Sequence, residues 1–572
     1  MERSDCIYTK RRECHDCHKC IRECPVKAIR VQGTYTRIVP EVCILCGNCV
    51  QVCPSNAKQV RDDLPLAQEL LASGRKVIAS LAPSFVAQYP HLRPAQLIHA
   101  LKQLGFAAVS ETALGAQQVS ANVHAAMQNE SRQIRISSAC PVVVDFITKY
   151  HDECQPYISP VLSPLLTHCK MLRQQYGNEI ATVFIGPCIA KKREADAHPE
   201  LLDVVLTYED LNHWLQQQAI DPAAIAEEAA DCFEPQAAQE GSLYPIEGGM
   251  APGLTDGHEL NHLQFMSFSG LDNVEQVLKD IPQWNPAHNI FFELTACAGS
   301  CINGPKAAPD TSIARRRYEV VHYAQPAEQL PRSATLTIRQ NYVAQPVMQP
   351  ECSDLQLTEA LRTIGKFSVD DELDCGGCGY ESCRDFAHAL IAGKAERMMC
   401  ATYTRKLAQK KAYALLQRMP SAVVIVDENL RIIECNAAFV RLFTGEEANP
   451  SDLEGNALST VIPFSNLFRR VLDSGEDLVN HDIRHLRSIL NTSIFAIEAH
   501  AVIGGIFRDI TEPTFQKEQI ISRARAVIEK NLKTVQQIAY LLGENAADSE
   551  ITLNSIVRSF SPEEVDDDGD AL

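Results

Sequence analysis

Short apolar runs alternate with longer helix-like stretches over the middle of the chain. Residues 77–82 form a mostly apolar run that stops at Pro83, which predicts a buried strand. Residues 97–104 carry apolar positions at helical spacing and are followed by Gly105, which predicts a helix and its end. Alternation of this kind is typical of an α/β domain. We therefore predict an α/β domain over residues 61–345.

The C-terminal part has a different pattern. Residues 423–426 predict a strand, and residues 430–434 predict its antiparallel return after a polar turn at residues 427–429. Asn436 occupies the position of a helix cap. We therefore expect an α+β domain here, so that the whole chain is a multidomain protein of α/β and α+β parts.

Beyond residue 512 the pattern is helical, and Asn531 interrupts its apolar stripe. Apolar residues fall at the spacing of heptad a and d positions, at Ile521, Ala524, Ile528, Val535, Ile538 and Leu542. This stripe predicts either a short coiled coil that joins two copies of the chain or a helix face packed on the preceding domain. The acidic run at residues 566–570 predicts a disordered tail.

Length and charge narrow the class of protein. A chain of 572 residues is expected to form about three to five domains. Its formal net charge of −19 disfavours nucleic acid and acidic membrane surfaces as partners, and residues 315–317, a run of three arginines, are expected on a solvated face. No apolar stretch is long enough to cross a bilayer, and the charged N-terminus lacks the apolar core of a signal peptide. We therefore expect a cytoplasmic protein.

The 22 cysteines change the picture, because most of them lie in tight clusters. The spacing C-x2-C-x2-C-x3-C-P occurs twice, and in a large chain without a signal peptide it points to metal or redox chemistry. In such pairs the fourth ligand of each cluster comes from the other run. We assign one [4Fe–4S] cluster to Cys14, Cys17, Cys20 and Cys53, and a second to Cys43, Cys46, Cys49 and Cys24. Two structural zinc sites are the alternative, but zinc does not explain the repeated C-P ending.

A third cysteine group follows a change in composition. Proline and glutamine are enriched over residues 324–352, which predicts a linker. The spacing C-x2-C-x4-C-x16-C then places four cysteines at Cys375, Cys378, Cys383 and Cys400. This spacing resembles the small single-cubane domain of several anaerobic redox proteins. Four thiolates suit zinc equally well, and the redox setting favours a further [4Fe–4S] cluster.

Three separate segments of the α/β domain also place cysteine beside small residues or proline. They are Ser-Ser-Ala-Cys-Pro at residues 137–141, Gly-Pro-Cys-Ile-Ala-Lys-Lys-Arg-Glu at residues 186–194, and Thr-Ala-Cys-Ala-Gly-Ser-Cys-Ile-Asn-Gly at residues 295–304. Each segment alone is a weak signal, since buried cysteines often only pack. Four cysteines from three loops can nevertheless hold one cluster in a domain core.

Together these segments resemble, in order and spacing, the three signature motifs of the [FeFe]-hydrogenase catalytic domain. The resemblance implies an H-cluster, which is a [4Fe–4S] cubane bridged to a diiron unit that carries CO, cyanide and an amine-containing dithiolate. It implies that Lys191 donates a hydrogen bond to a cyanide ligand, whereas Lys192 is expected at the surface. It also implies that the cubane is held, with a bridge to the diiron unit at the last residue, by Cys140, Cys188, Cys297 and Cys301.

The chain departs from the family motifs at positions that matter for turnover. Ala139 stands where efficient members have a cysteine that relays protons to the amine, and a methyl group cannot carry a proton. The acidic pair that continues this relay is replaced at about residues 121–122, although Glu194 is retained. Gly186 and Thr295 replace methionines, and Ser300 replaces a glycine. We expect slow turnover with the binding site retained, which suits a sensor of H2.

The strand, turn and cap pattern from residue 419 and the Gly-Gly-Ile-Phe-Arg-Asp-Ile-Thr segment near residue 504 resemble a PAS domain, whose ligand the sequence does not identify. No histidine follows His500 that could act as the phosphoacceptor of a kinase, so we expect output through a separate kinase, phosphatase or regulator. The expected domains are a ferredoxin domain, an H-cluster domain, a single-cluster domain, a PAS domain and a helical output segment, over residues 1–60, 61–345, 346–405, 406–515 and 516–572.

Three functions compete on this basis. The first is an H2 or redox sensor that exchanges electrons and protons with H2 at the H-cluster and relays electrons through its cubanes. The second is a working hydrogenase that uses a redox partner such as ferredoxin and carries an added regulatory domain. The third is a hydrogenase-like iron–sulfur assembly factor that never acquires the diiron unit.

Overall fold

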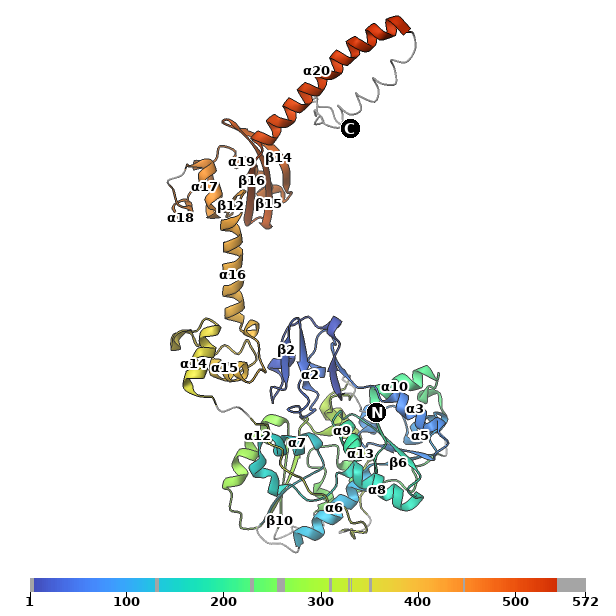
Figure 1. Cartoon of the computed structure of the whole chain (residues 1–572). Helices are drawn as coiled ribbons and strands as arrows, with labels where there is room; N and C mark the ends of the chain where they lie inside the picture. Colours follow the sequence, from blue (N-terminus) through green and yellow to red (C-terminus); the bar gives the residue numbers. More distant parts are fainter. Residues whose placement is uncertain are drawn as a thin grey trace. The chain divides into compact units, whose positions relative to one another are not determined.

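The chain forms two compact units, residues 1–404 and 405–572, in the computed structural model (Figure 1). The structure describes residues 5–128, 133–226, 231–254, 263–307, 311–327, 330, 332–348, 352–445 and 448–542. Within helix α20 the side chains of residues 512–516, 518 and 534–542 are outside this description. Each unit is therefore considered by itself. No described helix combines the length and the apolar character needed to cross a membrane.

The N-terminal part of the first unit is built from two small antiparallel sheets. β1 (Ile7–Thr9) pairs with β4 (Lys58–Val60), and β2 (Ile29–Gln32) pairs with β3 (Tyr35–Ile38). Two single-turn helices, α1 (Lys19–Arg22) and α2 (Asn48–Gln51), follow residues in the left-handed conformation. This arrangement gives each cysteine run one tight loop and one helical turn.

The α/β part contains the predicted strand and helix. β5 (Val77–Leu81) is buried along its whole length, as its mostly apolar pattern predicts. α5 (Pro94–Gln103) begins earlier than predicted, because Pro94 suits the first turn and the Gln96 side chain accepts a hydrogen bond from the backbone N–H of Arg93. β5 belongs to a parallel four-stranded sheet in the order β6-β5-β8-β9, with β6 at Ala108–Glu111, β8 at Ala181–Gly186 and β9 at Val204–Thr207.

A second parallel sheet of three strands lies in the same unit, in the order β10-β11-β7. Its strands are β10 (Leu263–Ser269), β11 (Asn289–Thr295) and β7 (Ile134–Ile136). The three cysteine segments follow the carboxyl ends of β7, β8 and β11. The helices around the two sheets are α3 (Leu64–Ala72), α4 (Phe85–Gln88), α6 (Ala113–Gln128), α7 (Pro141–Tyr150), α8 (Pro164–Tyr176), α9 (Lys191–Ala197), α10 (Tyr208–Gln217), α11 (Ala251–Leu254), α12 (Leu271–Asp280) and α13 (Ile313–Tyr323).

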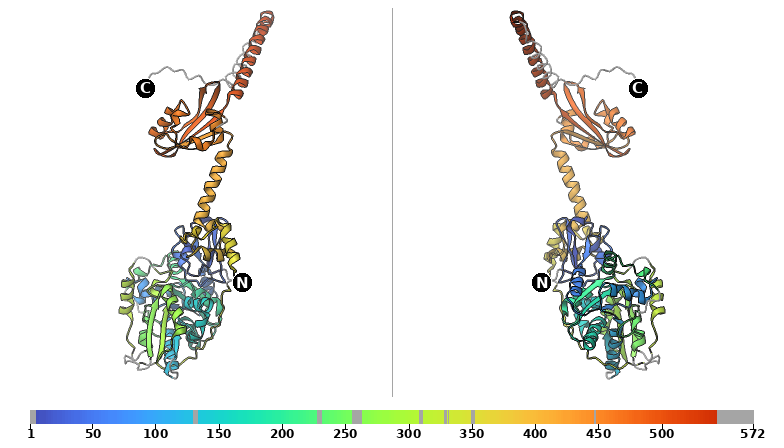
Figure 2. Two further views of the ribbon diagram at one scale, coloured as in Figure 1. Left: turned by 90° about the vertical axis from the view of Figure 1, so that its left-hand side faces the viewer. Right: turned by 90° about the vertical axis from the view of Figure 1, so that its right-hand side faces the viewer.

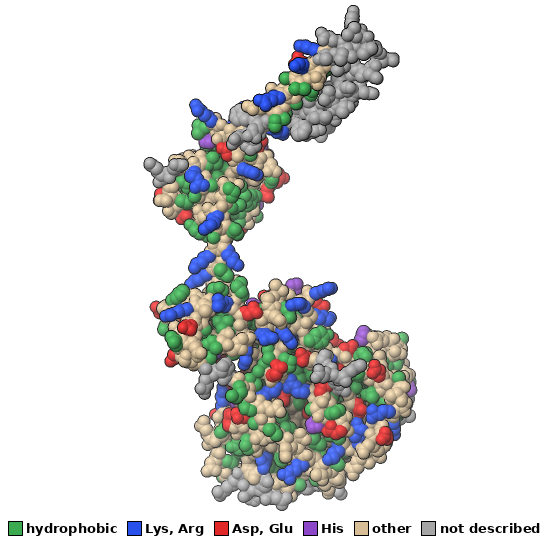
Figure 3. Space-filling view, in the orientation of Figure 1, with side chains coloured by type: hydrophobic (Ala, Val, Ile, Leu, Met, Phe, Trp, Pro, Cys, Tyr) green, Lys and Arg blue, Asp and Glu red, His purple; other side chains and the backbone are tan. Residues whose placement is uncertain are grey.

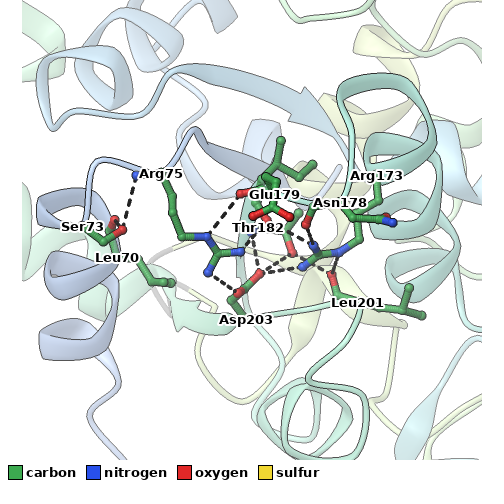
Figure 4. A network of polar contacts seen from close by, with 10 residues as sticks. Leu70, Ser73, Arg75, Arg173, Asn178, Glu179, Thr182, Leu201 and Asp203 are labelled. Carbon is green, nitrogen blue, oxygen red and sulfur yellow. Dashed lines mark hydrogen bonds and ion pairs between the residues drawn. The ribbon is translucent and has the colours of Figure 1, made fainter.

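A polar network ties the opposite, amino-terminal edge of the four-stranded sheet (Figure 4). The Asp203 carboxylate, just before β9, accepts hydrogen bonds from Arg173 Nη2 at 2.9 Å and from the Thr182 backbone N–H at 2.9 Å. Arg75 Nη1, just before β5, donates to the same carboxylate at 3.2 Å. One carboxylate thus fixes the starts of three strands, whereas the cysteine segments lie at strand ends.

Two cations expected at the surface are buried instead. Lys192 is fully buried, and its ammonium donates to Asp63 Oδ2 at 3.0 Å and to the Val205 carbonyl at 2.8 Å. Arg316, within the arginine run, is 5% exposed and donates to the Ile302 carbonyl at 3.2 Å. The surface prediction was wrong for both, because their partners come from distant segments that a local pattern does not reveal.

The expected linker is partly bound to the α/β part. The backbone N–H of Gln345 donates to the Thr148 carbonyl at 2.8 Å, and that of Leu162 donates to the Ile338 carbonyl at 2.8 Å. The third cysteine group follows, with Cys375 and Cys378 between α14 (Asp354–Thr363) and α15 (Cys383–Ile391), Cys383 at the start of α15, and Cys400 directly before α16 (Ala401–Arg418). None of the residues of α16 is buried, and Figure 3 shows lysine and arginine side chains along it.

The second unit contains a five-stranded antiparallel sheet in the order β13-β12-β16-β15-β14, with helices against one face (Figure 2). β12 (Ala422–Val426) and β13 (Ile432–Cys435) form the predicted hairpin, and Asn436 caps α17 (Ala437–Phe443) as predicted. The core between sheet and helices contains Phe439, Phe468 and Phe507. The other elements are α18 (Pro450–Leu453), α19 (Ser465–Ser474), β14 (Leu478–His485), β15 (Ser488–Glu498), β16 (Val502–Asp509) and α20 (Thr511–Leu542).

We expect the Asp203→Ala substitution to lower the free energy of unfolding of the first unit by about 2 kcal/mol, because charged hydrogen bonds to two arginines are lost. Chemical denaturation followed by the fluorescence of the buried Trp214 measures this change. Glu275→Ala, which breaks an exposed ion pair with Lys279, is the matched control and should cost below about 0.5 kcal/mol. Iron content should stay unchanged in both variants; loss of iron from Asp203→Ala would contradict this separation of the two sheet edges.

Candidate metal-cluster sites

The three cysteine segments meet around one largely apolar cavity of about 110 Å³. The cavity lies at the carboxyl ends of the parallel strands, where ligands of α/β folds bind. Ala139 and Lys191 line its wall. The structure brings all four predicted cubane ligands to this wall, namely Cys140, Cys188, Cys297 and Cys301.

Local sequence fixes how each thiol enters the cavity. Cys140 is the N-cap residue of α7, and Pro141 provides its first turn. Cys301 begins a short 3-10 turn after Ser300, whose backbone has φ 66° and ψ −159°. This conformation is almost confined to glycine, so Ser300 holds the loop under strain. Its buried hydroxyl lies 2.9 Å from Thr295 Oγ1, so two departures from the family motif form one hydrogen bond.

A third departure also has a structural reason. At Gly186, which stands where the family motif has methionine, a Cβ atom would lie 2.5 Å from Phe184 Cζ and 2.9 Å from Ala82 Cβ. The Phe184 ring lines the cavity in this region. An aromatic side chain from the same strand therefore occupies space near this motif, and only glycine fits beside it.

Three of the four thiols lie in surroundings that disfavour charge. Burial raises the pKa of Cys188 to about 11; the Lys191 charge opposes this increase and the charge of Cys140 adds to it. Burial also raises the pKa of Cys297 and Cys301, again with contributions from the other cysteines of the group. Cys301 has exposed side-chain surface although protein encloses it, because this surface faces the cavity. Four mutually repelling thiolates around a shared space fit an iron–sulfur cluster, whose iron replaces their protons.

Lys191 spans the distance from the cavity to a carboxylate behind it. Its ammonium donates to Glu194 Oε2 at 2.7 Å and lies 3.5 Å from the Ala139 carbonyl oxygen. Glu194 also accepts from Ser163 Oγ at 3.1 Å. Burial lowers the pKa of Lys191, but the charges of Glu194 and Cys188 outweigh burial, so the pKa is raised overall. The cavity therefore has a fixed cation in its wall.

Glu293 is a cavity residue that the sequence analysis missed. It lines the cavity from β11, and its Oε2 accepts from Ser267 Oγ and from the Gly248 backbone N–H, both at 2.8 Å. Burial raises its pKa to about 7, so the carboxyl can hold a proton near neutral pH. Its signal in the sequence is a single acid within the apolar run at residues 290–294.

The ferredoxin cysteines separate into two groups, as the sequence assignment requires. Burial raises the pKa of Cys49, and the charges of the three other members of its group, Cys46, Cys43 and Cys24, raise it further. Cys46 also lines the central cavity. Gly47 permits this approach, since a Cβ there would lie 2.5 Å from Pro305 Cβ. The group of Cys24, Cys43, Cys46 and Cys49 thus adjoins the cavity.

The other ferredoxin group contains Cys14, Cys17, Cys20 and Cys53. Burial raises the pKa of Cys20, and the Lys58 charge and the Thr36 hydroxyl oppose this increase, whereas Cys14 and Cys53 add to it. The effects of Cys14 and Cys53 on the pKa of Cys20 indicate that these three predicted ligands lie close together. Cys17 lies exposed on the same loop.

The third cysteine group has an unsatisfied neighbour. Burial raises the pKa of Cys378, and Cys400 and Cys375 add to the increase; Cys383 begins α15. The Tyr380 hydroxyl is buried and has no hydrogen-bond partner among the described residues. A cluster sulfur is a natural acceptor for such a hydroxyl, so this site fits an iron–sulfur group. Among the described residues no group of three or more histidine, cysteine, aspartate or glutamate side chains is arranged to hold a single metal ion.

Comparisons with known families agree with this geometry. Residues 75–305 match the family described as "Iron only hydrogenase large subunit, C-terminal domain", and residues 13–57 match the 4Fe-4S dicluster domain. Residues 371–402 match an Fe-S cluster family, which favours a cluster over zinc at the third cysteine group. Residues 411–510 match the PAS fold.

Individual relatives are distant. The chain is 25% identical, over 49% of its length and 59% of the relative's, to the NADP-reducing hydrogenase subunit HndD of Solidesulfovibrio fructosivorans. It is 23% identical to iron hydrogenase 1 of Clostridium pasteurianum, over 48% of this chain and 60% of that protein. The chain therefore spans about three-fifths of the length of these curated relatives.

Solved structures give low overall scores. An [FeFe]-hydrogenase of Chlamydomonas reinhardtii is 17% identical, with a TM-score of 0.38, and the match covers 50% of this chain and 100% of that one. The PAS domain of nitrogen regulation protein NR(II) from Vibrio parahaemolyticus is 22% identical, with a TM-score of 0.15, over 17% of this chain and 97% of that one.

The chain thus carries the C-terminal domain typical of [FeFe]-hydrogenase large subunits, together with an N-terminal ferredoxin dicluster domain, an Fe–S region and a C-terminal PAS domain. The family resemblance and the fold class expected from the sequence are both confirmed. The individual ligand residues and the domain limits stay predictions.

We expect Cys188→Ser to remove about four iron atoms per chain, because the weaker oxygen ligand does not hold the corner of a cubane. Iron analysis of the anaerobically purified chain measures the loss. Cys232→Ser, at an exposed cysteine outside all four groups, is the control and should keep the full iron content. Equal iron contents in the two variants would refute the assignment of Cys188 as a ligand.

Proposed function

We propose that this protein is a slow, H2-responsive [FeFe]-hydrogenase that passes electrons through its [4Fe–4S] clusters and delivers its signal through the PAS unit. The observation that carries this proposal is Ala139, which lines the cavity directly beside Cys140. Its methyl group offers no proton, so the cavity keeps a cluster-binding wall and lacks a proton donor at the position beside Cys140, where fast turnover requires one.

The H-cluster would be held by Cys140, Cys188, Cys297 and Cys301. When bound, it supplies an open iron site for H2 and a pendant amine that takes up a proton. The chain supplies the surroundings. The Lys191 ammonium donates to an anionic ligand from a fixed position, and the Glu194 carboxylate holds it there. The apolar lining excludes water and strengthens this interaction.

Electrons would leave the cavity through the nearer ferredoxin group, that of Cys24, Cys43, Cys46 and Cys49. Cys46 lines the cavity. Burial raises the pKa of Cys297 most, the other thiols of the cavity group raise it further, and the charge of Cys46 adds a smaller increase. A cluster held by the four cysteines of this ferredoxin group would therefore be the first acceptor in this account. The route would continue through a cluster held by Cys14, Cys17, Cys20 and Cys53 and one held by the third cysteine group.

The second unit is the output part in this account. Its core is packed with phenylalanine rings, including Phe439 and Phe443 with centroids 4.9 Å apart. On α20, Ile521, Ala524 and Ile528 are partly shielded while the positions between them are exposed, which suits a homodimeric coiled coil. The predicted heptad positions 535, 538 and 542 lie outside the described side chains. A kinase, phosphatase or regulator is the proposed receiver.

A working hydrogenase that exchanges electrons with a partner such as ferredoxin is the second candidate. It is supported by the 25% identity to a subunit of an NADP-reducing hydrogenase. An assembly factor without diiron is a remote third candidate, because it gives Lys191 in the cavity wall no role. Turnover and its response to the residue at position 139 separate the first two candidates.

We expect Ala139→Cys to raise the rate of H2 turnover by about a hundredfold, because it returns a proton donor to the cavity wall. Hydrogen evolution by the fully matured chain with a chemical reductant measures this rate. Ala139→Val, which adds volume without a proton, is the control and should show no gain. Fast turnover of the wild-type chain, or no increase in the cysteine variant with intact clusters, would contradict the proposed slow step.

A further inference from the structure

Lys58 is a buried cation that the proposed function does not use. It begins β4, opposite Thr9 of β1, and is 1% exposed. No carboxylate among the described residues lies within ion-pair distance of its ammonium. A buried charge without a counterion is costly, so this position calls for negative charge from another source.

Lys58 is connected through one threonine to Cys20, a predicted ligand of the ferredoxin group of Cys14, Cys17, Cys20 and Cys53. Its ammonium donates to Thr9 Oγ1 at 2.7 Å, to the Thr36 carbonyl at 3.1 Å and to Thr36 Oγ1 at 2.9 Å. Thr36, also 1% exposed, places the same hydroxyl 3.5 Å from Cys20 Sγ and 3.8 Å from Cys14 Sγ.

The direction of these hydrogen bonds follows from the ammonium group, which has three protons and no acceptor. Thr36 Oγ1 must accept from Lys58, so its own proton is left to donate toward the sulfur of Cys20. The Lys58 ammonium and the Thr36 hydroxyl therefore both stabilise negative charge on the Cys20 sulfur. Both favour additional negative charge on a cluster bound there.

The second ferredoxin run offers an internal comparison. Lys58 is the fifth residue after Cys53, and Ile29 is the fifth residue after Cys24. The backbone matches in the two runs, because the amide of Ala57 donates to Cys53 Sγ at 3.2 Å and that of Ala28 donates to Cys24 Sγ at 3.3 Å. Ile29 is buried and carries no charge. The two halves thus differ in charge at one equivalent buried position.

We propose that Lys58 and Thr36 raise the reduction potential of the [4Fe–4S] cluster held by Cys14, Cys17, Cys20 and Cys53. A higher potential stabilises the reduced form of this cluster, so an electron that reached it would be held longer. The other ferredoxin cluster has cations of its own, because Lys149 Nζ and Arg193 Nη2 both donate to the Cys43 carbonyl oxygen, at 2.9 and 3.0 Å, so the proposal concerns only the change that Lys58 and Thr36 cause. The inference rests on the ligand assignment and is independent of whether the chain responds to H2.

Lys58→Met tests the proposal, because methionine keeps the length of the side chain and removes its charge. The full chain is prepared with its [4Fe–4S] clusters but without diiron maturation. The clusters are reduced stepwise at controlled potentials, and electron paramagnetic resonance measures how much of each cluster is reduced. We expect the equilibrium constant for reduction of one cluster to fall about tenfold or more, a shift of about 59 mV for one electron. The other clusters should move less.

Two further variants make the result decisive. Thr36→Val keeps the shape of the side chain and removes the hydroxyl, so a smaller shift of the same cluster in the same direction is expected. Lys19→Met removes an exposed charge next to Cys20, and solvent screening should leave the potentials unchanged. If Lys58→Met fails to retain the cluster, Thr36→Val decides alone.

The two ways to fail are distinguishable. Unchanged potentials in Lys58→Met and Thr36→Val, with full iron content and signal intensity, would overturn the proposal while leaving the clusters in place. An equal shift in Lys19→Met would also overturn it, because any nearby positive charge would then suffice. Absence of the ferredoxin clusters from the wild-type chain would instead refute the ligand assignment.

Discussion

Ligation of buried thiols is the interaction on which the first unit depends. Burial raises the pKa of Cys188 to about 11 and that of Cys297 and Cys301 as well, so the thiols of this group cannot ionise together without a compensating group. In the proposed site, iron would supply that compensation and join segments that are far apart in the sequence. The folded state of this region and the presence of its cluster are therefore linked. The polar network around Asp203 secures the opposite sheet edge without any metal.

The surroundings of the cavity separate binding from turnover. The cavity wall contains four cysteines, the Lys191 ammonium and a largely apolar lining, whereas the residue beside Cys140, Ala139, has only a methyl group. The departures from the family motifs are also internally consistent. Thr295 and Ser300 bond to each other, and the Phe184 ring requires glycine at position 186. These substitutions therefore fit together within one wall of the cavity.

Much of this arrangement could be predicted from local patterns. The apolar run of β5 and the hairpin of β12 and β13 are visible because strand and turn signals lie within a few residues of each other. The cysteine groups are visible because cluster ligands have fixed spacings. Burial of Lys58, Lys192 and Arg316 could not be predicted, since each depends on partners brought in by the fold. Glu293 was missed for the same reason: one acid in a strand gains meaning only when the strand ends at the cavity.

Infrared spectroscopy of the anaerobically matured chain, first under argon and then under H2, tests the central claim most directly. The account predicts CO and cyanide bands under argon that shift when H2 is added, because a diiron unit in the cavity of Cys140, Cys188, Cys297 and Cys301 responds to the gas. Absence of these bands after verified maturation would contradict the account and leave an electron-transfer or assembly role for the chain.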